Sequence, residues 1–177
     1  MSADGAPQQG RYRPGVVTRT ARWVASGWLR PGWHVPAQGA AMLAHALPGG
    51  PGVRPPVPVR VLGAAGVVAG VAWSTTAALT LGSDLTPAVT PRPGVGLRSD
   101  GVYGLSRHPL YTGLLVASAG AVLLRGRVST LLAATALAGV LHVKAAAEEA
   151  VLAERFGAPY LAYRARVPRL VGVPRRG

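Results

Sequence analysis

The 177-residue chain has no cysteine and few charged residues of either sign. The lack of cysteine excludes disulfides, thiolate nucleophiles and cysteine-based metal sites. Only 14% of the residues are charged, against roughly 25% in ordinary soluble domains. This scarcity of charge favours a membrane protein over the alternative of a soluble, alanine-rich helical domain.

Acidic residues are the scarcest charged group, with six Asp and Glu against 19 Lys and Arg and a formal net charge of +13. Such an excess can indicate nucleic-acid binding. Here, however, the arginines lie between apolar stretches, as membrane-flanking charges do, so no nucleic-acid partner is expected. The apolar residues make up 49% of the chain. They are mostly small, which suits close packing of helices in lipid.

Four windows contain no Lys, Arg, Asp or Glu: residues 31–53, 61–83, 108–124 and 128–143. A spanning helix needs about 20 mostly apolar residues, so the second window qualifies directly. The last two predict a tight helical hairpin, whose second helix should extend past Lys144 with that side chain snorkelling. Prolines confine any helix in the first window to about residues 37–47, which predicts an irregular or partly re-entrant segment.

The basic residues are distributed asymmetrically about these windows. With four crossings and a cytoplasmic N-terminus, 15 of the 19 Lys and Arg lie inside. The four left outside are Arg54, Arg60, Arg125 and Arg127. Without the first crossing the split becomes 10 to 9, which the positive-inside rule disfavours. We therefore expect an all-α, multi-span protein of the cell (inner) membrane, with a C-terminal transmembrane hairpin and a short cytoplasmic C-terminal helix.

The chain divides by composition into three parts. Residues 1–30 are expected to form a basic, partly disordered tail, and residues 31–96 the N-terminal membrane segments and a loop. Residues 97–177 hold the hairpin and the C-terminal segment. A secretory signal is the competing account of the first 46 residues, but some 30 residues precede any apolar core and Pro36 interrupts it. The loop from Ser83 to Arg107 is expected to lack regular structure.

Ionisable residues lie where the first helix of the predicted hairpin begins and where its second helix approaches its end. Arg107 and His108 precede Pro109, which suits the first turn of a helix. They therefore stand at the positive end of a helix dipole, where anions bind. Because the hairpin is antiparallel, Glu148 and Glu149 return to the same level on the second helix. Charged groups kept beside hydrocarbon indicate a functional site.

Six sequence elements follow one another over about residues 97–170. They are Gly101 with Tyr103, Arg107-His108-Pro109-Leu110-Tyr111, the apolar hairpin, Glu148-Glu149 with Leu152, Phe156-Gly157 with Tyr160 and Tyr163, and Val167-Pro168-Arg169. This order resembles the integral-membrane methyltransferases of the isoprenylcysteine carboxyl methyltransferase and phospholipid methyltransferase type. The resemblance implies S-adenosylmethionine-dependent methyl transfer to a lipophilic or small acceptor at the cytoplasmic face.

The resemblance also implies a pocket for S-adenosylmethionine. The residues it assigns to that pocket are Tyr103, Arg107, His108, Pro109, Tyr111, Glu148 and Glu149. A carboxylate suits the ammonium group and ribose diol of the cofactor, and Arg107 or helix-start N–H groups suit its carboxylate. Which of the two glutamates makes the contact stays open. The candidate catalytic residues are His108 and Arg107, and the candidate substrate-binding residues are Tyr160, Tyr163 and Arg169.

The chemistry expected of such a site places few demands on acid or base groups. Displacement at a sulfonium depends on alignment and exclusion of water. A carboxylate or thiol acceptor reacting as its anion needs no base, whereas an amine acceptor needs a proton acceptor, for which His108 is available. No metal is expected, because the other three histidines have no metal-ligand spacing. They are His34, His45 and His142.

Plainer interpretations of the same residues stay open. Glu148 and Glu149 can form a solvated helix end that pairs with Lys144 or Arg155. Tyr160 and Tyr163 can belong to an interfacial aromatic belt.

Two other functions compete with methyl transfer. Membrane sterol and steroid reductases that use NADPH have a similar Arg-His-Pro-x-Tyr turn, but in them the tyrosine is commonly followed by Gly-Glu, where this chain has Thr112-Gly113-Leu114. A non-enzymatic membrane partner protein would leave Arg107, His108 and Glu149 without a ligand to compensate their cost. Nothing in the sequence distinguishes a carboxylate, an amine and a thiol as the methyl acceptor.

Overall fold

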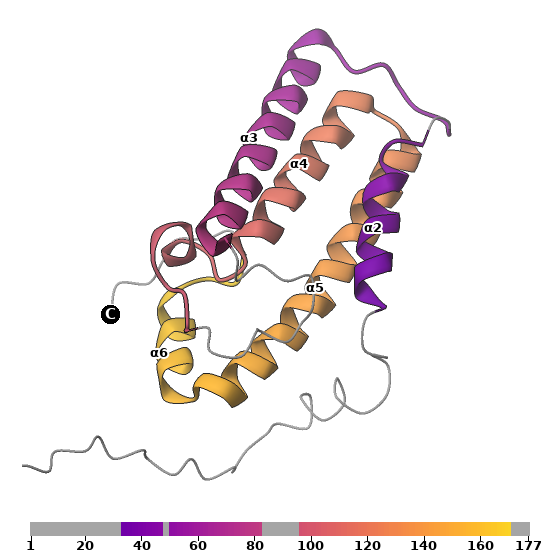
Figure 1. Cartoon of the computed structure of the whole chain (residues 1–177). Helices are drawn as coiled ribbons and strands as arrows, with labels where there is room; N and C mark the ends of the chain where they lie inside the picture. The colour runs from indigo at the N-terminus through magenta and orange to yellow at the C-terminus, as the bar shows by residue number, and fades with distance from the viewer. Residues whose placement is uncertain (1–32, 48–49, 83–95, 171–177) are drawn as a thin grey trace, which may run out of the picture.

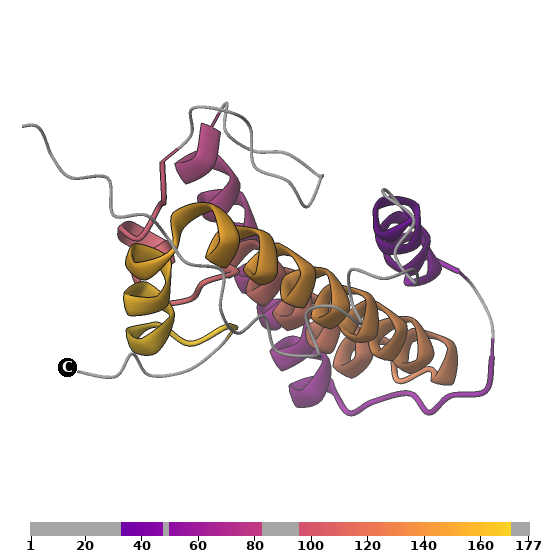
Figure 2. The ribbon, with the colours of Figure 1, turned by 90° about the horizontal axis from the view of Figure 1, so that it is seen from below.

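The computed structural model describes residues 33–47, 50–82 and 96–170, and this part of the chain is helical with no named strand. Its helices are α2 (His34–Ala44), α3 (Val57–Leu81), the 3-10 helix η2 (Gly101–Gly104), α4 (Pro109–Arg125), α5 (Val128–Phe156) and α6 (Ala158–Arg166). Helices α3, α4 and α5 lie side by side and run antiparallel in turn (Figure 1). Helix α2 packs on α5. Helix α6 lies at the end of α5 (Figure 2). The all-α prediction is confirmed.

The predicted hairpin is formed by α4 and α5. Pro109 occupies the first turn of α4, where a missing N–H costs nothing. Gly126 ends α4 in the left-handed region at a φ of 59°, and its N–H donates to the carbonyl of Val122. Because glycine adopts this conformation without steric cost, α5 can begin two residues later at Val128. The turn thus returns the chain antiparallel to α4.

Of the helices in the described ranges, two are long and apolar enough to cross a membrane, α3 with 25 residues and α5 with 29. Helix α4 is apolar but shorter, with 17 residues. Helix α2 has 11 residues and is too short to cross alone, as expected. The prediction that α2 begins near residue 37 was wrong. It begins at His34, because Pro36 falls in the first turn and removes no intrahelical hydrogen bond there.

Glycines allow α3 and α4 to pack with their backbones in close contact. A Cβ added at Gly63 would lie 2.6 Å from the amide nitrogen of Leu124, and one added at Gly120 would lie 2.6 Å from the carbonyl oxygen of Gly63. Small residues are the usual means by which membrane helices approach each other. Helix α3 therefore packs closely on the α4 side of the hairpin and supports it.

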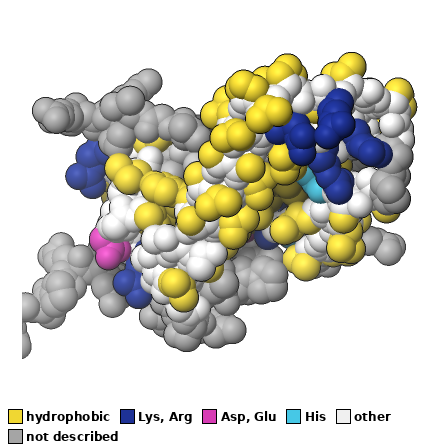
Figure 3. Space-filling view, turned by 90° about the horizontal axis from the view of Figure 1, so that it is seen from above, with side chains coloured by type: hydrophobic (Ala, Val, Ile, Leu, Met, Phe, Trp, Pro, Cys, Tyr) yellow, Lys and Arg dark blue, Asp and Glu magenta, His cyan; other side chains and the backbone are white. Residues whose placement is uncertain are grey.

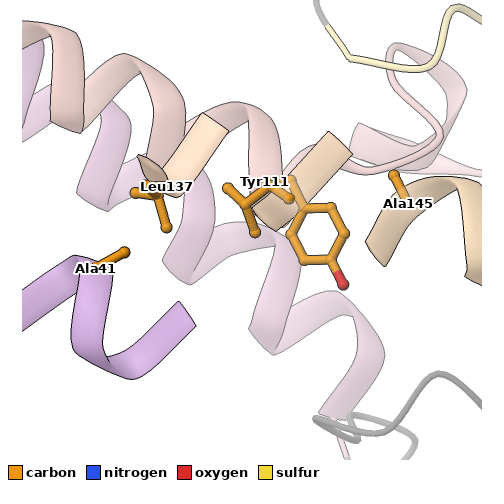
Figure 4. Close-up of a cluster of buried hydrophobic side chains, with 5 residues drawn as sticks. Ala41, Tyr111, Leu137 and Ala145 are labelled. Atoms are coloured by element: carbon orange, nitrogen blue, oxygen red, sulfur yellow. The ribbon is translucent and has the colours of Figure 1, made fainter. Parts of the chain in front are cut away.

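The buried core joins α2, α4 and α5. Ala41, Tyr111, Leu137 and Ala145 belong to one buried cluster that extends along α5, with Ala41 beside Leu137 at one end and Tyr111 towards Ala145 at the other (Figure 4). A second buried cluster contains Tyr160, Tyr163 and Val167, at the C-terminal end of the described chain. Tyr111 is thus held by the first cluster at the start of α4.

Two sequence expectations need correction. Lys144 does not snorkel, since it is 4% exposed and its Nζ donates to Oε1 of Gln38 at 3.2 Å. Helix α2 covers this level of α5 and supplies the acceptor, which makes burial of the amine possible. The loop before α4 is not wholly irregular either, because the positive φ of Gly101 allows a 3-10 turn there. The rest of that loop, at residues 83–95, and the tail at 1–30 lie outside the described residues.

Candidate active site

The Arg107-His108 turn is fixed to the C-terminal segment by backbone hydrogen bonds. The N–H of Arg107 donates to the carbonyl of Pro168 at 2.9 Å, and the N–H of His108 donates to the carbonyl of Arg169 at 3.0 Å. Ser106 adds a bond from its Oγ to the carbonyl of Arg169 at 3.2 Å. These bonds bring residues about 60 positions apart to the start of α4.

The guanidinium of Arg107 ties this turn to α5 and α6. Its Nε and Nη2 donate to Oε1 of Glu149 at 3.1 and 2.8 Å. Its Nη1 donates to the carbonyls of Arg164 and Val167 at 2.9 and 2.7 Å. This one side chain therefore connects the turn before α4 with α5 and with the end of α6. It is only 10% exposed.

Glu149 is the most enclosed carboxylate among the described residues, at 3% exposed. Arg169 pairs with it through two bonds, from Nε to Oε1 at 2.9 Å and from Nη2 to Oε2 at 2.7 Å. Nε2 of His108 lies 3.3 Å from Oε1. Together with Arg107, these partners occupy both carboxylate oxygens. Glu149 is therefore not part of a solvated helix end.

His108 is buried between the two glutamates, just before α4 and outside the spanning helices. Its Nδ1 lies 3.3 Å from Oε2 of Glu148 and its ring stacks on Tyr111, with the centroids 5.3 Å apart. Burial alone lowers the pKa of His108, but the hydrogen bonds and charges of Glu148 and Glu149 outweigh it, so this pKa lies above its ordinary value. The geometry thus favours a protonated imidazole.

Glu148 is the more open of the two carboxylates, with 17% of its side chain exposed. Its Oε1 accepts a 2.6 Å hydrogen bond from the hydroxyl of Tyr111. The Nζ of Lys144 lies 5.2 Å from the centroid of the same tyrosine ring. Since each carboxylate oxygen has two lone pairs, Glu148 retains the capacity to bind a further donor.

Tyrosines form the wall next to this network. The hydroxyl of Tyr163 donates to the carbonyl of Tyr103 at 2.7 Å. Tyr160 is fully buried, and its hydroxyl has no hydrogen-bond partner in the described structure. Burial, followed by the charge of Glu148, raises the pKa of Tyr103 to about 12. Burial also raises the pKa of Tyr160 and Tyr163. All three phenols are therefore neutral, and the buried pair does not form an interfacial belt.

Most of the residues predicted for the site are joined in one network, which we name the polar cluster. It consists of Arg107, His108, Tyr111, Glu148, Glu149 and Arg169. Pro109 positions the cluster as the first residue of α4. Tyr103, Tyr160 and Tyr163 lie in the adjoining wall.

Sequence reasoning missed two features around the cluster. Ser106 and Thr112 are buried and bonded through their hydroxyls at 3.1 Å, and Lys144 is held by Gln38 at 3.2 Å. The only signal for Ser106 was its place directly before Arg107. No group of three or more His, Asp or Glu that could hold a metal occurs in the described part of the chain.

Comparison with known proteins gives two findings. The family model described as phospholipid methyltransferase matches residues 59–159. A 79-residue stretch is 39% identical to Protein-S-isoprenylcysteine O-methyltransferase of Schizosaccharomyces pombe, covering 44% of this chain and 33% of that protein. The chain thus matches about a third of the length of this curated relative. The family match includes Arg107, His108 and both glutamates, whereas Tyr160, Tyr163 and Arg169 lie beyond its end.

Proposed function

The chain belongs to the phospholipid methyltransferase family, and on that premise we propose that it transfers a methyl group from S-adenosylmethionine to a lipophilic or small acceptor at the membrane surface. The observation that carries this proposal is the polar cluster, which joins the Arg107 turn, both glutamates and Arg169 at one end of apolar helices. Ionisable groups kept at the end of apolar helices are rare and mark functional sites in membrane proteins.

The residues present fit S-adenosylmethionine by their chemistry. Glu148 provides a partly exposed carboxylate for an ammonium group or a ribose diol. Tyr103 is partly exposed and lies near enough to Glu148 for that charge to act on it, so its ring provides an aromatic face that suits a sulfonium. When bound, S-adenosylmethionine supplies an electrophilic methyl group that leaves a neutral thioether. The cluster therefore needs to align the reactants and exclude water more than to supply a strong base.

We assign different roles to the two glutamates. Both oxygens of Glu149 are engaged by Arg107, Arg169 and His108, so Glu149 is a positioning residue. Glu148 has two protein partners and an exposed edge, so Glu148 is the residue that contacts the cofactor. The greater exposure of Glu148 supports this proposal for the choice that the sequence left open.

His108 and Arg107 support Glu148 in this proposal. The protonated imidazole of His108 presents one ring N–H to Glu148 and the other to Glu149, and so orients Glu148. A carboxylate or thiolate acceptor needs no proton transfer at this site, whereas for an amine acceptor His108 would first have to lose that proton. Its role as proton acceptor therefore stays a prediction. Arg107 fixes the C-terminal segment over the cluster.

The acceptor is proposed to approach at Arg169, beside the wall of Tyr160 and Tyr163, which are themselves buried and would support this side from within. Arg169 is the most exposed cation of the polar cluster, at 31%, and lies next to this wall in sequence and in space. We assign these three residues to the acceptor side. The positive-inside distribution of Lys and Arg supports a cytoplasmic location for the cluster, in the cell membrane.

Equilibrium binding of labelled S-adenosylmethionine and of NADPH to the full chain in detergent tests the proposal. We expect saturable binding of S-adenosylmethionine and none of NADPH. Binding of NADPH would favour the reductase alternative, and binding of neither would favour a non-enzymatic membrane partner. Incubating the protein with lipid extracts and an isotopically labelled methyl donor, followed by mass spectrometry, then identifies the acceptor.

A further inference from the structure

Four arginines line a groove at the end of the molecule away from the polar cluster. They are Arg54, Arg60, Arg125 and Arg127. The groove has a cavity volume of about 580 Å³ and lies between the C-terminal end of α2, the segment before α3 and the α4–α5 turn. Figure 3, which views this end of the molecule, shows a cluster of Lys and Arg side chains among hydrophobic ones. We call this feature the arginine groove.

Backbone contacts hold the walls of the arginine groove together. The N–H of Val53 donates to the carbonyl of Gly126 at 3.0 Å, and the N–H of Val128 donates to the carbonyl of Pro51 at 3.0 Å. A Cβ added at Gly52 would lie 3.1 Å from Cα of Arg127. The segment carrying Arg54 is therefore fixed against the turn that carries Arg125 and Arg127.

No carboxylate of the described residues compensates these arginines. The ion pairs formed within the described chain all involve Glu148 or Glu149, at the opposite end of the hairpin. The 17 residues of α4 place that end about 25 Å away, which is beyond the Debye length of about 8 Å at physiological salt. Within the described part of the chain, Arg125 donates to a neutral group, the carbonyl of His45. Four like charges fixed in one groove favour binding of an anion.

The surroundings of the groove indicate that this anion carries acyl chains. Val57 and Val61 on the first turns of α3 are 69% and 62% exposed, and Val128 at the start of α5 is 46% exposed. These side chains continue directly from the groove along helices that are long and apolar enough to span a membrane. A free phosphate would use the guanidinium groups alone, whereas a phospholipid would also cover this apolar surface.

We propose that the arginine groove binds the phosphate of an anionic phospholipid, with its acyl chains lying along the exposed start of α3. The lipid belongs to the leaflet opposite the one that holds the polar cluster, since α4 separates the two ends by nearly the thickness of the hydrocarbon core. Bidentate guanidinium contacts suit a phosphate group. This inference is independent of the proposed methyl transfer.

Native mass spectrometry of the full chain tests the inference, using protein taken from vesicles of phosphatidylglycerol and phosphatidylcholine. We expect the wild-type protein to retain phosphatidylglycerol in preference to phosphatidylcholine. The double variant Arg60→Gln with Arg127→Gln should lose this preference, with affinity falling about fivefold for each arginine removed. The matched control is Arg166→Gln on α6, whose exposed side chain donates to the carbonyl of Ala162 in its own helix, and it should retain the lipid.

Three outcomes would overturn the inference. They are equal retention of phosphatidylglycerol by the double variant, loss of the lipid in the Arg166→Gln control, and complete displacement of the lipid by millimolar inorganic phosphate. The last result would assign the groove to a free anion. If the double variant does not fold, thermal unfolding of the wild-type protein decides. Phosphatidylglycerol should raise the unfolding temperature above the value in phosphatidylcholine, and rising salt should remove the difference.

Discussion

Arg107 and Glu149 stand 42 positions apart in the sequence, yet Nη2 of the arginine lies 2.8 Å from Oε1 of the glutamate. The pair closes the α4–α5 hairpin at the end where α4 begins. Both side chains are largely buried, at 10% and 3% exposed. Because each charge depends on the other for compensation, removing one leaves the other buried without its partner.

The first prediction concerns this dependence. Glu149→Gln should lower the free energy of unfolding by about 3–5 kcal/mol, because it leaves Arg107 and Arg169 without their shared carboxylate. Thermal unfolding in detergent measures the effect. The control is Glu154→Gln on the same helix, where the side chain is exposed and little change is expected. Equal unfolding temperatures for both variants would refute the positioning role of Glu149.

Glu148 should show the opposite balance between stability and binding. Glu148→Gln keeps the shape of the side chain but removes its charge, so we expect S-adenosylmethionine to bind about tenfold or more weakly, with a smaller loss of stability than in Glu149→Gln. Equilibrium binding and thermal unfolding of both variants separate the two roles. A large loss of stability with unchanged affinity in Glu148→Gln would reverse our assignment of the glutamates.

A third prediction follows from the raised pKa of His108. Because the folded-state pKa lies above the unfolded value of 6.5, the stability that His108 contributes is fully present below about pH 6.5. It is lost as the pH rises through the folded-state pKa. Unfolding of the wild-type protein and of His108→Gln across this range measures the effect.

The difference in stability between those two proteins should be largest at low pH and shrink as the pH rises. Comparing them removes the contributions of His34, His45 and His142, which both proteins retain. A difference that stays constant with pH would show that Glu148 and Glu149 do not raise the pKa of His108, contrary to the geometry.

Much of the fold could be predicted from local sequence signals. The charge-free windows and the Arg125-Gly126-Arg127 turn specified the hairpin, because a glycine that can adopt the left-handed conformation between two arginines favours the end of an apolar helix. The convergence of the Arg107 turn with the two glutamates followed from antiparallel geometry alone. Helix α2 was shifted by three residues, because a proline is tolerated in a first turn as readily as it ends a helix.

The partners within the site could not be predicted in the same way. Nothing local indicates that Arg169 rather than Lys144 pairs with Glu149, since this depends on how the segment after α6 returns to α4 through the carbonyls of Pro168 and Arg169. Lys144 is buried because α2, from a distant part of the chain, covers it with Gln38. Such contacts are set by tertiary packing, which a single sequence does not reveal.

The packing of α3 against α4 provides the last prediction. Gly120→Ala should destabilise the protein by about 1–3 kcal/mol, because the added methyl group would lie 2.6 Å from the carbonyl oxygen of Gly63 and 2.6 Å from the amide nitrogen of Val67. Both are backbone atoms of α3, so the helices would have to separate. The matched control is Gly139→Ala on α5, where a Cβ has nothing within 4 Å.

The control should leave stability unchanged or raise it by up to about 1 kcal/mol, since alanine is the better helix former. Thermal unfolding of both variants in the same detergent gives the comparison, and helicity measured by circular dichroism checks that each has folded. Because α4 carries His108 and Tyr111 at its start, separation of α3 and α4 should also weaken binding of S-adenosylmethionine in Gly120→Ala. If Gly120→Ala were as stable as Gly139→Ala, close contact between α3 and α4 could not be the support on which the polar cluster rests.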